Sequence, residues 1–500
     1  MSNRRRRVAL RRTAVRTRTY GGVAVLAAAV VAISACHDSS PTAASSDPPR
    51  NPPIVGALAV SIPPAGLTLR ASYTVDNATA AVVLVQAVGV GAARRVVAPI
   101  KSGQASAIVT ALEPGVKYTI QGVALNEKDS VRTALDTVTV AALPADLEGV
   151  QFPTSAPSTD SAFMLTTLAR GTTNYALAFD RGGRIVWYRG FAGEGTGLGD
   201  LQQQPNGHFT MFLGNTYGWQ PLPGKFVEFG PDGEVLREYL PPEGRYMDDH
   251  ELRLRPDGVG GMDAYTIMYD IRPMDLTGHG GDASSTAAVH QIVRITASGE
   301  VQTIFDAGSR FTPDDWVSLP LEGLGDIDHP NAFDFAPDGG ILVSWRNLSA
   351  VTKHDPVTGS VLWQLGGRQS TLTLEDDPLE GFSGQHSVRA IGPTGFLIYD
   401  NGPNHLPPET RAAQYEVDAA TQKARLVWQF RHEPSLFTPF TGSVQRLADG
   451  RTFIGYSDGR CAMVRADGSL EWEGQLTVND AKANTYRILR LPSLVEYEVP

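Results

Sequence analysis

Three histidines, one asparagine and one arginine stand at equivalent points of a repeated sequence pattern and are the residues best suited to chemistry. His250 and Asn331 each precede the aspartate of a Pro-Asp-Gly turn by seven residues, and His386 precedes the threonine of a Pro-Thr-Gly turn by eight. His329 lies two residues before Asn331, so both side chains would face the same side of a strand. Arg346 directly follows the next apolar run. The shared spacing predicts that all five side chains converge on one pocket.

The types of these residues favour group transfer to or from an anion. Arginine binds oxyanions through several hydrogen bonds at once. A neutral histidine is a nucleophile or a proton carrier near pH 7. Together they suit transfer of a tetrahedral anionic group through a covalent histidine adduct, with Arg346, Asn331 and a second histidine facing its oxygens. Carboxylates are expected only from Asp248 and Asp249, which either orient His250 by hydrogen bonding or line solvent.

Two other interpretations compete with this one. A three-histidine metal site is possible in principle, but a guanidinium beside a cation is electrostatically unfavourable, so we expect neither a metal nor a cofactor. Isolated polar residues at such positions often bind only water, whereas five in register favour a site. The remaining histidines are expected on turns or outer segments, as surface or packed residues: His208, His279, His290, His354, His405 and His432.

A weak internal repeat would position these residues. Turn-like segments, most of them with an acid-x-Gly or x-Gly turn before an apolar strand, recur six times: 180–187, 231–236, 297–302, 356–363, 419–428 and 466–472. A second recurring hairpin alternates with them, clearest at 250–268, 331–345, 386–399 and 442–456 and looser from Phe163 and Leu201. A period of roughly fifty to sixty residues is typical of propeller blades.

The repeat predicts an all-β protein whose residues 150–500 form a six-bladed β-propeller of four-stranded antiparallel blades. A seven-bladed propeller with one unseen blade is the rival architecture. The innermost strand of each blade would begin near His250, Asn331 or His386, and the second strand would return to the same mouth at Arg346. Four tryptophans recur with the blades at the turns of the outermost strands and are expected to be packing residues: Trp187, Trp363, Trp428 and Trp472.

Residues 54–143 form a separate pattern of short β runs, at 81–90, 105–112, 117–125 and 133–140, that predicts a β-sandwich. Leu112-Glu-Pro-Gly-Val-Lys-Tyr118 resembles the tyrosine corner of fibronectin type III-like domains. No catalytic constellation accompanies it, so a spacer or docking role is expected.

The N-terminus has the pattern of an export signal. Residues 1–35 hold eight arginines and no acid. The arginines lie between Arg4 and Arg18, and an apolar stretch follows them from Gly21 to Ile33. Ile33-Ser-Ala-Cys36 resembles a lipobox, which implies cleavage before Cys36, lipidation of its thiol and a membrane anchor; an ordinary signal peptide is the alternative. Residues 36–53 are rich in Ser, Pro and Ala and predict a flexible tether. The expected location is periplasmic or outer-membrane.

Composition narrows the function further. Over 500 residues, 42% are hydrophobic and 19% charged, which excludes a disordered chain and permits a large core. The net charge of −10 includes the basic leader, so the folded part is more acidic still and nucleic acid is not expected as a partner.

The residues singled out above also carry a family resemblance. Five segments together resemble bacterial arylsulfate sulfotransferases over residues about 150–490: Asp248-Asp-His250-Glu-Leu, His329-Pro-Asn331-Ala-Phe, Leu342-Val-Ser-Trp-Arg346, Thr358-Gly-Ser-Val-Leu-Trp-Gln-Leu-Gly-Gly367 and Gln385-His386-Ser-Val-Arg. The resemblance implies a six-bladed propeller after an N-terminal sandwich, and ping-pong sulfuryl transfer from an aryl sulfate ester to a phenol without a nucleotide donor. Periplasmic members have a disulfide, which Cys36 cannot form with Cys461 if it is lipidated.

The resemblance also implies a role for each site residue. His386 would become sulfated, His250 would be the general acid and base, and His329, Asn331 and Arg346 would hold the sulfuryl oxygens. The alternative function is a non-catalytic propeller that binds an anionic ligand, a glycan or a protein partner at the cell envelope. The sequence leaves the oligomeric state open, a homodimer included.

Overall fold

The computed structural model describes residues 51–155, 162–215, 223–317 and 325–495. Residues 1–48 form one unit of the chain and residues 49–500 another. The predicted signal segment, Cys36 and most of the predicted tether lie outside the described residues. Within the described ranges the protein is all-β, as predicted, and the helices are three 3₁₀ turns: η1 (Ala145–Leu147), η2 (Ala307–Ser309) and η3 (Pro313–Asp315). No helix among these residues is long and apolar enough to cross a membrane.

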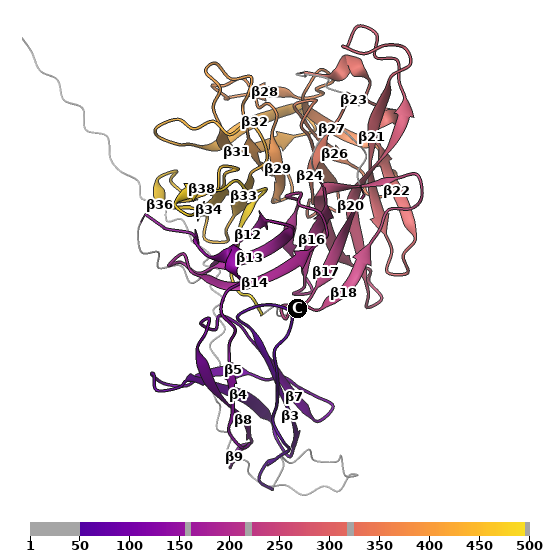
Figure 1. Ribbon diagram of the computed structural model, residues 1–500. Helices are drawn as coiled ribbons and strands as arrows, with labels where there is room; N and C mark the ends of the chain where they lie inside the picture. Colours follow the sequence, from indigo (N-terminus) through magenta and orange to yellow (C-terminus); the bar gives the residue numbers. More distant parts are fainter. Residues whose placement is uncertain (1–50, 156–161, 216–222, 318–324, 496–500) are drawn as a thin grey trace, which may run out of the picture. The chain divides into compact units, whose positions relative to one another are not determined.

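Two five-stranded sheets occupy the N-terminal part of the described chain (Figure 1). The first has the order β1-β3-β7-β6 with β2 on β3, and the second β10-β8-β4-β5 with β9 on β8. Their strands are β1 (Ile54–Val55), β2 (Ala59–Ser61), β3 (Leu69–Asp76), β4 (Ala80–Ala87), β5 (Arg94–Val97), β6 (Ile100–Lys101), β7 (Gln104–Val109), β8 (Lys117–Leu125), β9 (Ser130–Arg132) and β10 (Asp136–Thr139).

The four predicted runs correspond to β4, β7, β8 and β10, but the sequence reading missed β3. That strand alternates buried and intermediate or exposed residues, and Tyr73 in it donates a hydrogen bond to the Val82 carbonyl across the two sheets, at 2.8 Å. At the predicted tyrosine corner, the Glu113 backbone N–H donates to the Tyr118 hydroxyl at 2.9 Å.

Six further sheets each contain a path of four antiparallel strands (Figure 1). In chain order their strands are β12 (Phe163–Arg170), β13 (Thr173–Phe179), β14 (Ile185–Ala192) and β39 (Ile488–Leu491); β15 (Leu201–Gln203), β16 (Phe209–Gly214), β17 (Gly224–Phe229) and β18 (Val235–Tyr239); β19 (Tyr246–Pro256), β20 (Met262–Pro273), β21 (Thr286–Ile295) and β22 (Val301–Asp306); β24 (Pro330–Phe335), β25 (Ile341–Trp345), β26 (Ala350–His354) and β27 (Val361–Gly366); β29 (His386–Ile391), β30 (Gly395–Asp400), β31 (Arg411–Asp418) and β32 (Lys423–Arg431); and β33 (Ser443–Arg446), β34 (Thr452–Gly455), β35 (Arg460–Val464) and β36 (Leu470–Gln475).

Short additional strands complete the described chain. β23 (Gly325–Asp326) pairs with β21, and β28 (Thr373–Glu375) with β32. A small sheet consists of β11 (Val150–Gln151), β37 (Thr477–Val478) and β38 (Ala481–Lys482).

The turns that drove the repeat analysis do form the hairpins. At Pro337-Asp-Gly, Gly339 adopts a φ of 88°, which a glycine reaches without steric cost, and the Asp338 carboxylate accepts the Gly340 N–H at 3.0 Å. These local bonds reverse the chain between β24 and β25, so that Pro330 pairs with Trp345. The start of one strand and the end of the next therefore lie side by side.

The first sheet departs from the predicted hairpin order. The hairpin expected from Phe163 exists as β12 and β13, but β12 has β39 on its other side, with Phe163 opposite Leu491. One edge strand of this sheet thus comes from near the C-terminus. Internal periodicity could not reveal it, because the four strands of this sheet are not contiguous in the sequence.

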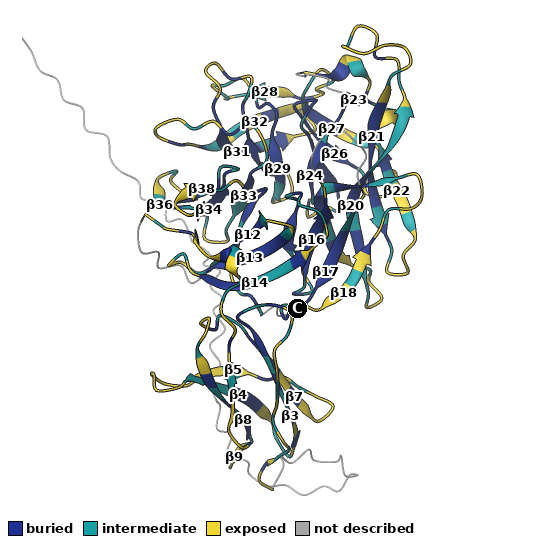
Figure 2. Ribbon diagram, viewed as in Figure 1, coloured by how far each residue is buried: buried dark blue, intermediate teal, exposed yellow. Residues whose placement is uncertain are grey.

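Packing between the six sheets is apolar and aromatic. Trp187, which is fully buried, stacks on Phe209 with ring centroids 5.0 Å apart and lies parallel to Phe229. Trp363 and Trp472 are also buried. Figure 2 shows buried residues along the strands and exposed ones at the turns. Because residues along the strands are buried and residues at the turns are exposed, a polar residue that is buried at the end of a strand needs a specific hydrogen-bond partner.

Candidate functional site

The five predicted site residues come from three successive sheets. His250 lies within β19. His329 stands directly before β24, Asn331 is the second residue of that strand, and His386 begins β29. Arg346 follows β25, and its backbone N–H donates to the His329 carbonyl at 3.0 Å. β19 lies beside β24, and β24 lies beside β29. The repeat registry therefore brings these residues together as predicted.

His386 is held as a neutral imidazole with a defined tautomer. Its Nδ1 lies 2.7 Å from Asn401 Oδ1, and Asn401 Nδ2 donates to the carbonyls of Thr438 and Thr441. Since those two bonds orient the amide, Oδ1 must accept and Nδ1 must donate. The lone pair of Nε2 faces the Thr441 backbone N–H at 3.2 Å. Nε2 is thus the ring nitrogen that carries the lone pair.

Burial and neighbouring cations keep His386 unprotonated. The side chain is 2% exposed, and burial, the Arg346 guanidinium and His250 together lower the pKa of His386 well below 6.5. Little of the imidazole is therefore open to solvent. The low pKa favours nucleophilic attack over proton binding.

The segment that carries Thr441 depends on one glycine. Gly442, which stands in the repeat where His250 and Asn331 stand, has a φ of 106°. A Cβ there would lie 2.3 Å from the Tyr399 ring. A glycine is therefore required for the chain to approach Tyr399 this closely, next to the N–H that meets His386.

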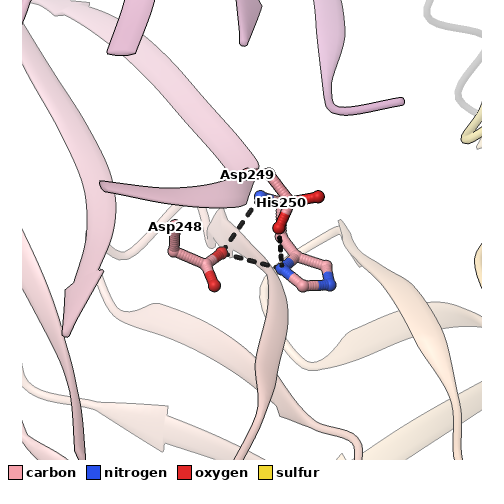
Figure 3. Close-up of side chains that lie close together, drawn as sticks. All are labelled: Asp248, Asp249 and His250. Atoms are coloured by element: carbon pink, nitrogen blue, oxygen red, sulfur yellow. Dashed lines mark hydrogen bonds and ion pairs between the residues drawn. The ribbon is translucent and has the colours of Figure 1, made fainter. Parts of the chain in front are cut away.

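His250 carries a proton at neutral pH. Asp248 Oδ1 lies 2.8 Å from His250 Nδ1 and also accepts the backbone N–H of His250, while Asp249 Oδ1 lies 3.4 Å from the same nitrogen. Figure 3 shows both contacts on one ring nitrogen, with the other nitrogen pointing away. Burial by itself would lower the pKa of His250, but the two carboxylates raise it to about 9. Of the two predicted alternatives, the orienting role of Asp248 is confirmed.

His329 adjoins His250 and has its own carboxylate partner. The two ring centroids are 4.8 Å apart in an edge-on arrangement. His329 Nδ1 bonds Asp326, and its backbone N–H donates to Asp328 Oδ1 at 2.8 Å. The residue has a φ of 45°, which a non-glycine residue adopts rarely. The prediction that carboxylates come only from Asp248 and Asp249 was wrong, since Asp326 and Asp328 approach from the segment before β24.

His290 was also misplaced by the sequence reading. It lies on β21 rather than on a turn or outer segment, is 5% exposed, and bonds Asp328 through Nδ1. Its Nε2 lies 3.7 Å from Asp248 Oδ2. His290 precedes the recurring turn segment 297–302 by seven residues, but it lies on the third strand of its sheet rather than on the edge strand that carries His250, so this spacing was not assigned to the site.

Asn331 and Arg346 have partners of their own in the structure. Asn331 is fully buried and its Nδ2 donates to the Gln385 carbonyl at 2.7 Å, which ties β24 to the residue before His386. The partly buried Arg346 donates from Nη1 to Asn347 Oδ1 at 2.7 Å, and its guanidinium carbon lies 5.4 Å from the centre of the Phe440 ring. In this arrangement Asn331 holds the segment that leads to His386, whereas the guanidinium of Arg346 lies near the imidazoles of the site.

Two residues before β39 reach the site and were missed. The Tyr486 hydroxyl donates to the His250 carbonyl at 3.2 Å. Arg487 donates to the Asn331 carbonyl at 2.9 Å and pairs with Asp200 and Glu251, at 2.6 and 2.9 Å. Only the pairing of β39 with β12 could have indicated them.

Among the described residues, two groups of side chains have donor atoms close enough to hold a cation: Asp248 with Asp249 and His250, and His290 with Asp326 and Asp328. In both groups the histidine Nδ1 already faces a carboxylate.

A cavity of about 580 Å³ is lined mainly by residues between Leu365 and Ser383. Leu365, Leu372 and Phe382 form apolar wall, and Arg368 and Glu380 add charges of opposite sign. None of the five predicted site residues is part of this lining.

Comparisons with known proteins identify a family for most of the chain. Residues 150–486 match the family described as arylsulfotransferase (ASST). No protein of curated function matches the chain. Among solved structures, a protein of unknown function from Bacteroides caccae is 12% identical, with a TM-score of 0.39, over 67% of this chain and 100% of that one. BBS1N in complex with ARL6DN is 10% identical, with a TM-score of 0.30, over 66% and 86%.

Proposed function

We propose that this chain, which belongs to the arylsulfotransferase (ASST) family, moves a sulfuryl group from an aryl sulfate ester to a phenol through a sulfated His386. One observation carries the proposal: a buried, neutral histidine whose Nδ1 is fixed by Asn401 and whose Nε2 is available beside Arg346 and two other histidines. No nucleotide donor is required.

In the first half-reaction, His386 Nε2 gives up its hydrogen bond from Thr441 and attacks the ester sulfur. The N–S bond forms, the S–O(aryl) bond breaks, and its electron pair leaves on the phenolate oxygen. The His250 imidazolium, protonated below about pH 9, gives that oxygen a proton. The products are a phenol and a sulfated His386 with a neutral His250.

In the second half-reaction, a phenol replaces the first product. Its oxygen attacks sulfur while His250 takes the phenolic proton, and the N–S electron pair returns to His386. Arg346 and the imidazole of His329 face the charge on the sulfuryl oxygens in both steps, and the Thr441 N–H, released from Nε2, is a third donor. Asn331 acts through the Gln385 carbonyl.

The decisive experiment is intact-mass spectrometry after mixing the protein with 4-nitrophenyl sulfate and no acceptor. We expect one added sulfuryl group, lost when phenol is supplied. His386→Asn should abolish the adduct and turnover. His354→Asn is the matched control, because His354 is equally buried on β26 but bonds only Thr352 and the Gly359 carbonyl. A folded His386→Asn protein that still transfers sulfuryl would overturn the mechanism and favour a binding protein.

The same proposal includes an architecture. We infer that the six sheets close into a six-bladed propeller, because β39 joins the first sheet and each edge strand that carries the site lies beside the next. The N-terminal pair of sheets has the strand order expected of a fibronectin III-like sandwich.

We further propose that Cys36 anchors the exported protein to a membrane, as its lipobox-like context indicates. Cys36→Ser should move the protein from the membrane fraction to the soluble fraction. A Cys461→Ser control should leave it in place, since that thiol is buried. Continued membrane association of the Cys36→Ser protein would contradict the anchor.

A further inference from the structure

We propose that His290 is a positioning residue that shares Asp248 with His250 and thereby sets the protonation and orientation of that imidazole. The inference rests on the proposed function, because His250 is the acid and base of the transfer. His290 itself touches none of the reacting atoms. Its influence passes through a carboxylate.

The geometry forms a continuous chain of contacts. His250 Nδ1 meets Asp248 Oδ1 at 2.8 Å, and Asp248 Oδ2 lies 3.7 Å from His290 Nε2. On its other side His290 Nδ1 bonds Asp328, whose Oδ1 also accepts the His329 backbone N–H. Asp248, His290 and Asp328 are all at least 94% buried, at 6%, 5% and 2% exposure. One imidazole therefore joins the carboxylates that serve two site histidines.

The charges in this chain decide what His290 does. It faces Asp248 from β19, Asp326 and Asp328 from β23 and the turn after it, and the Tyr269 ring from β20, 5.3 Å away. Against burial, which lowers it, these carboxylates raise the pKa of His290 to about 9. His290 is thus an imidazolium at neutral pH, and it and His250 hold the pKa of Asp248 below its ordinary value against burial.

A shared carboxylate acts less strongly on each partner. His250 is faced by Asp248 and Asp249 from its own strand, by His329 and His386, and by Tyr486 and Arg487 from the segment before β39. If His290 loses its charge, Asp248 is left to His250 alone. The pKa of His250 should then rise, and at pH 8 less of the deprotonated form needed to accept the proton of the phenol would be present.

The test is a histidine titration by NMR of the full-length protein labelled with ¹³C at histidine Cε1, with the His250 signal assigned from His250→Asn. In His290→Gln the His250 titration should move to higher pH by about half a unit or more, a severalfold change in the deprotonated fraction. His354→Gln is the matched control, because His354 is buried on the corresponding strand of the next sheet, where its ring nitrogens bond Thr352 and the Gly359 carbonyl instead of these carboxylates.

Asp328→Asn provides a second variant that leaves the His290 ring in place. Loss of its partner should lower the pKa of His290 and shift His250 in the same direction as His290→Gln. An unchanged His250 titration in both folded variants would overturn the proposal. Because the readout is a resting-state titration, it remains informative even if no aryl sulfate is turned over, so failure of the proposed function is a separate result.

Discussion

At the scale of single residues, the site separates two histidines by their surroundings. His386 sits among cations and accepts an amide N–H, so it is neutral. His250 sits between two carboxylates, so it is charged. The proposed nucleophile and the proposed acid are residues of the same type, and their protonation states differ because of the groups that lie within a few ångströms of each.

This separation predicts the pH dependence of the first half-reaction. The pKa of His250 is raised to about 9, so the acid form is complete at pH 7 and is lost as the pH rises through 9. Adduct formation from an ester with a poorly leaving phenol should fall over that range, whereas an ester of 4-nitrophenol should be little affected. Stopped-flow measurement with both donors checks this. In His250→Asn, the difference between the two donors in pH dependence should disappear. A pH-independent rate with the poor leaving group would contradict the assignment.

The sequence predicted some of the site residues and missed others, and the difference has a physical cause. His250, His329, Asn331, Arg346 and His386 were found because each lies at a fixed distance from a turn whose chemistry is local. His290, Asp326 and Tyr486 were not found as site residues, because their contacts depend on how separate sheets pack. Asp248 was found because it stands two residues before His250, whereas the contact of Asp328 with His290 and the cations around His386 depend on packing between segments far apart in the sequence.

At the scale of elements, the loops after β30 and before β33 orient the nucleophile. Asn401 links them, since its amide accepts from His386 and donates to Thr438 and Thr441. The hairpins 386–399 and 442–456 were predicted, but the bonding between the loops beside them was not, because the two segments are about forty residues apart in the sequence.

Replacing Asn401 by alanine should therefore cost more activity than stability. The variant leaves His386 free to take the wrong tautomer, and we expect adduct formation to fall by about 10²-fold or more, by comparison with other oriented catalytic histidines. Unfolding should become easier by about 1–3 kcal/mol. Asn174→Ala is a control, as its buried amide donates to the Gly195 carbonyl away from the site. Comparable rates for the two variants, measured by stopped flow, would argue against the orienting role.

At the scale of the whole molecule, the buried imidazoles couple stability to pH. The folded-state pKa values of His250 and His290 are raised to about 9 from 6.5. The unfolded chain releases these protons near pH 6.5, so the stabilisation is complete below that pH and is lost as the pH rises through 9. Each group contributes at most on the order of 3 kcal/mol.

Thermal unfolding followed by circular dichroism should show this loss. We expect Tm to decline between pH 6.5 and pH 9.5, and the decline to be roughly halved in His290→Gln, whose remaining raised imidazole is His250. The matched His354→Gln protein should keep the full decline, because the pKa of His354 is lowered to about 4 by burial. A flat Tm across this range in the unaltered protein would refute the protonated state of both groups.

The pairing of β39 with β12 has a consequence for how the protein comes into being. Tyr486 and Arg487, which hold the backbone of His250 and Asn331, are synthesised after every histidine of the site. A nascent or truncated chain that stops short of them has every histidine of the site but lacks the bonds that fix two of its strands. During synthesis, the strands that carry His250 and Asn331 can therefore be fixed only after residue 487 has joined the fold.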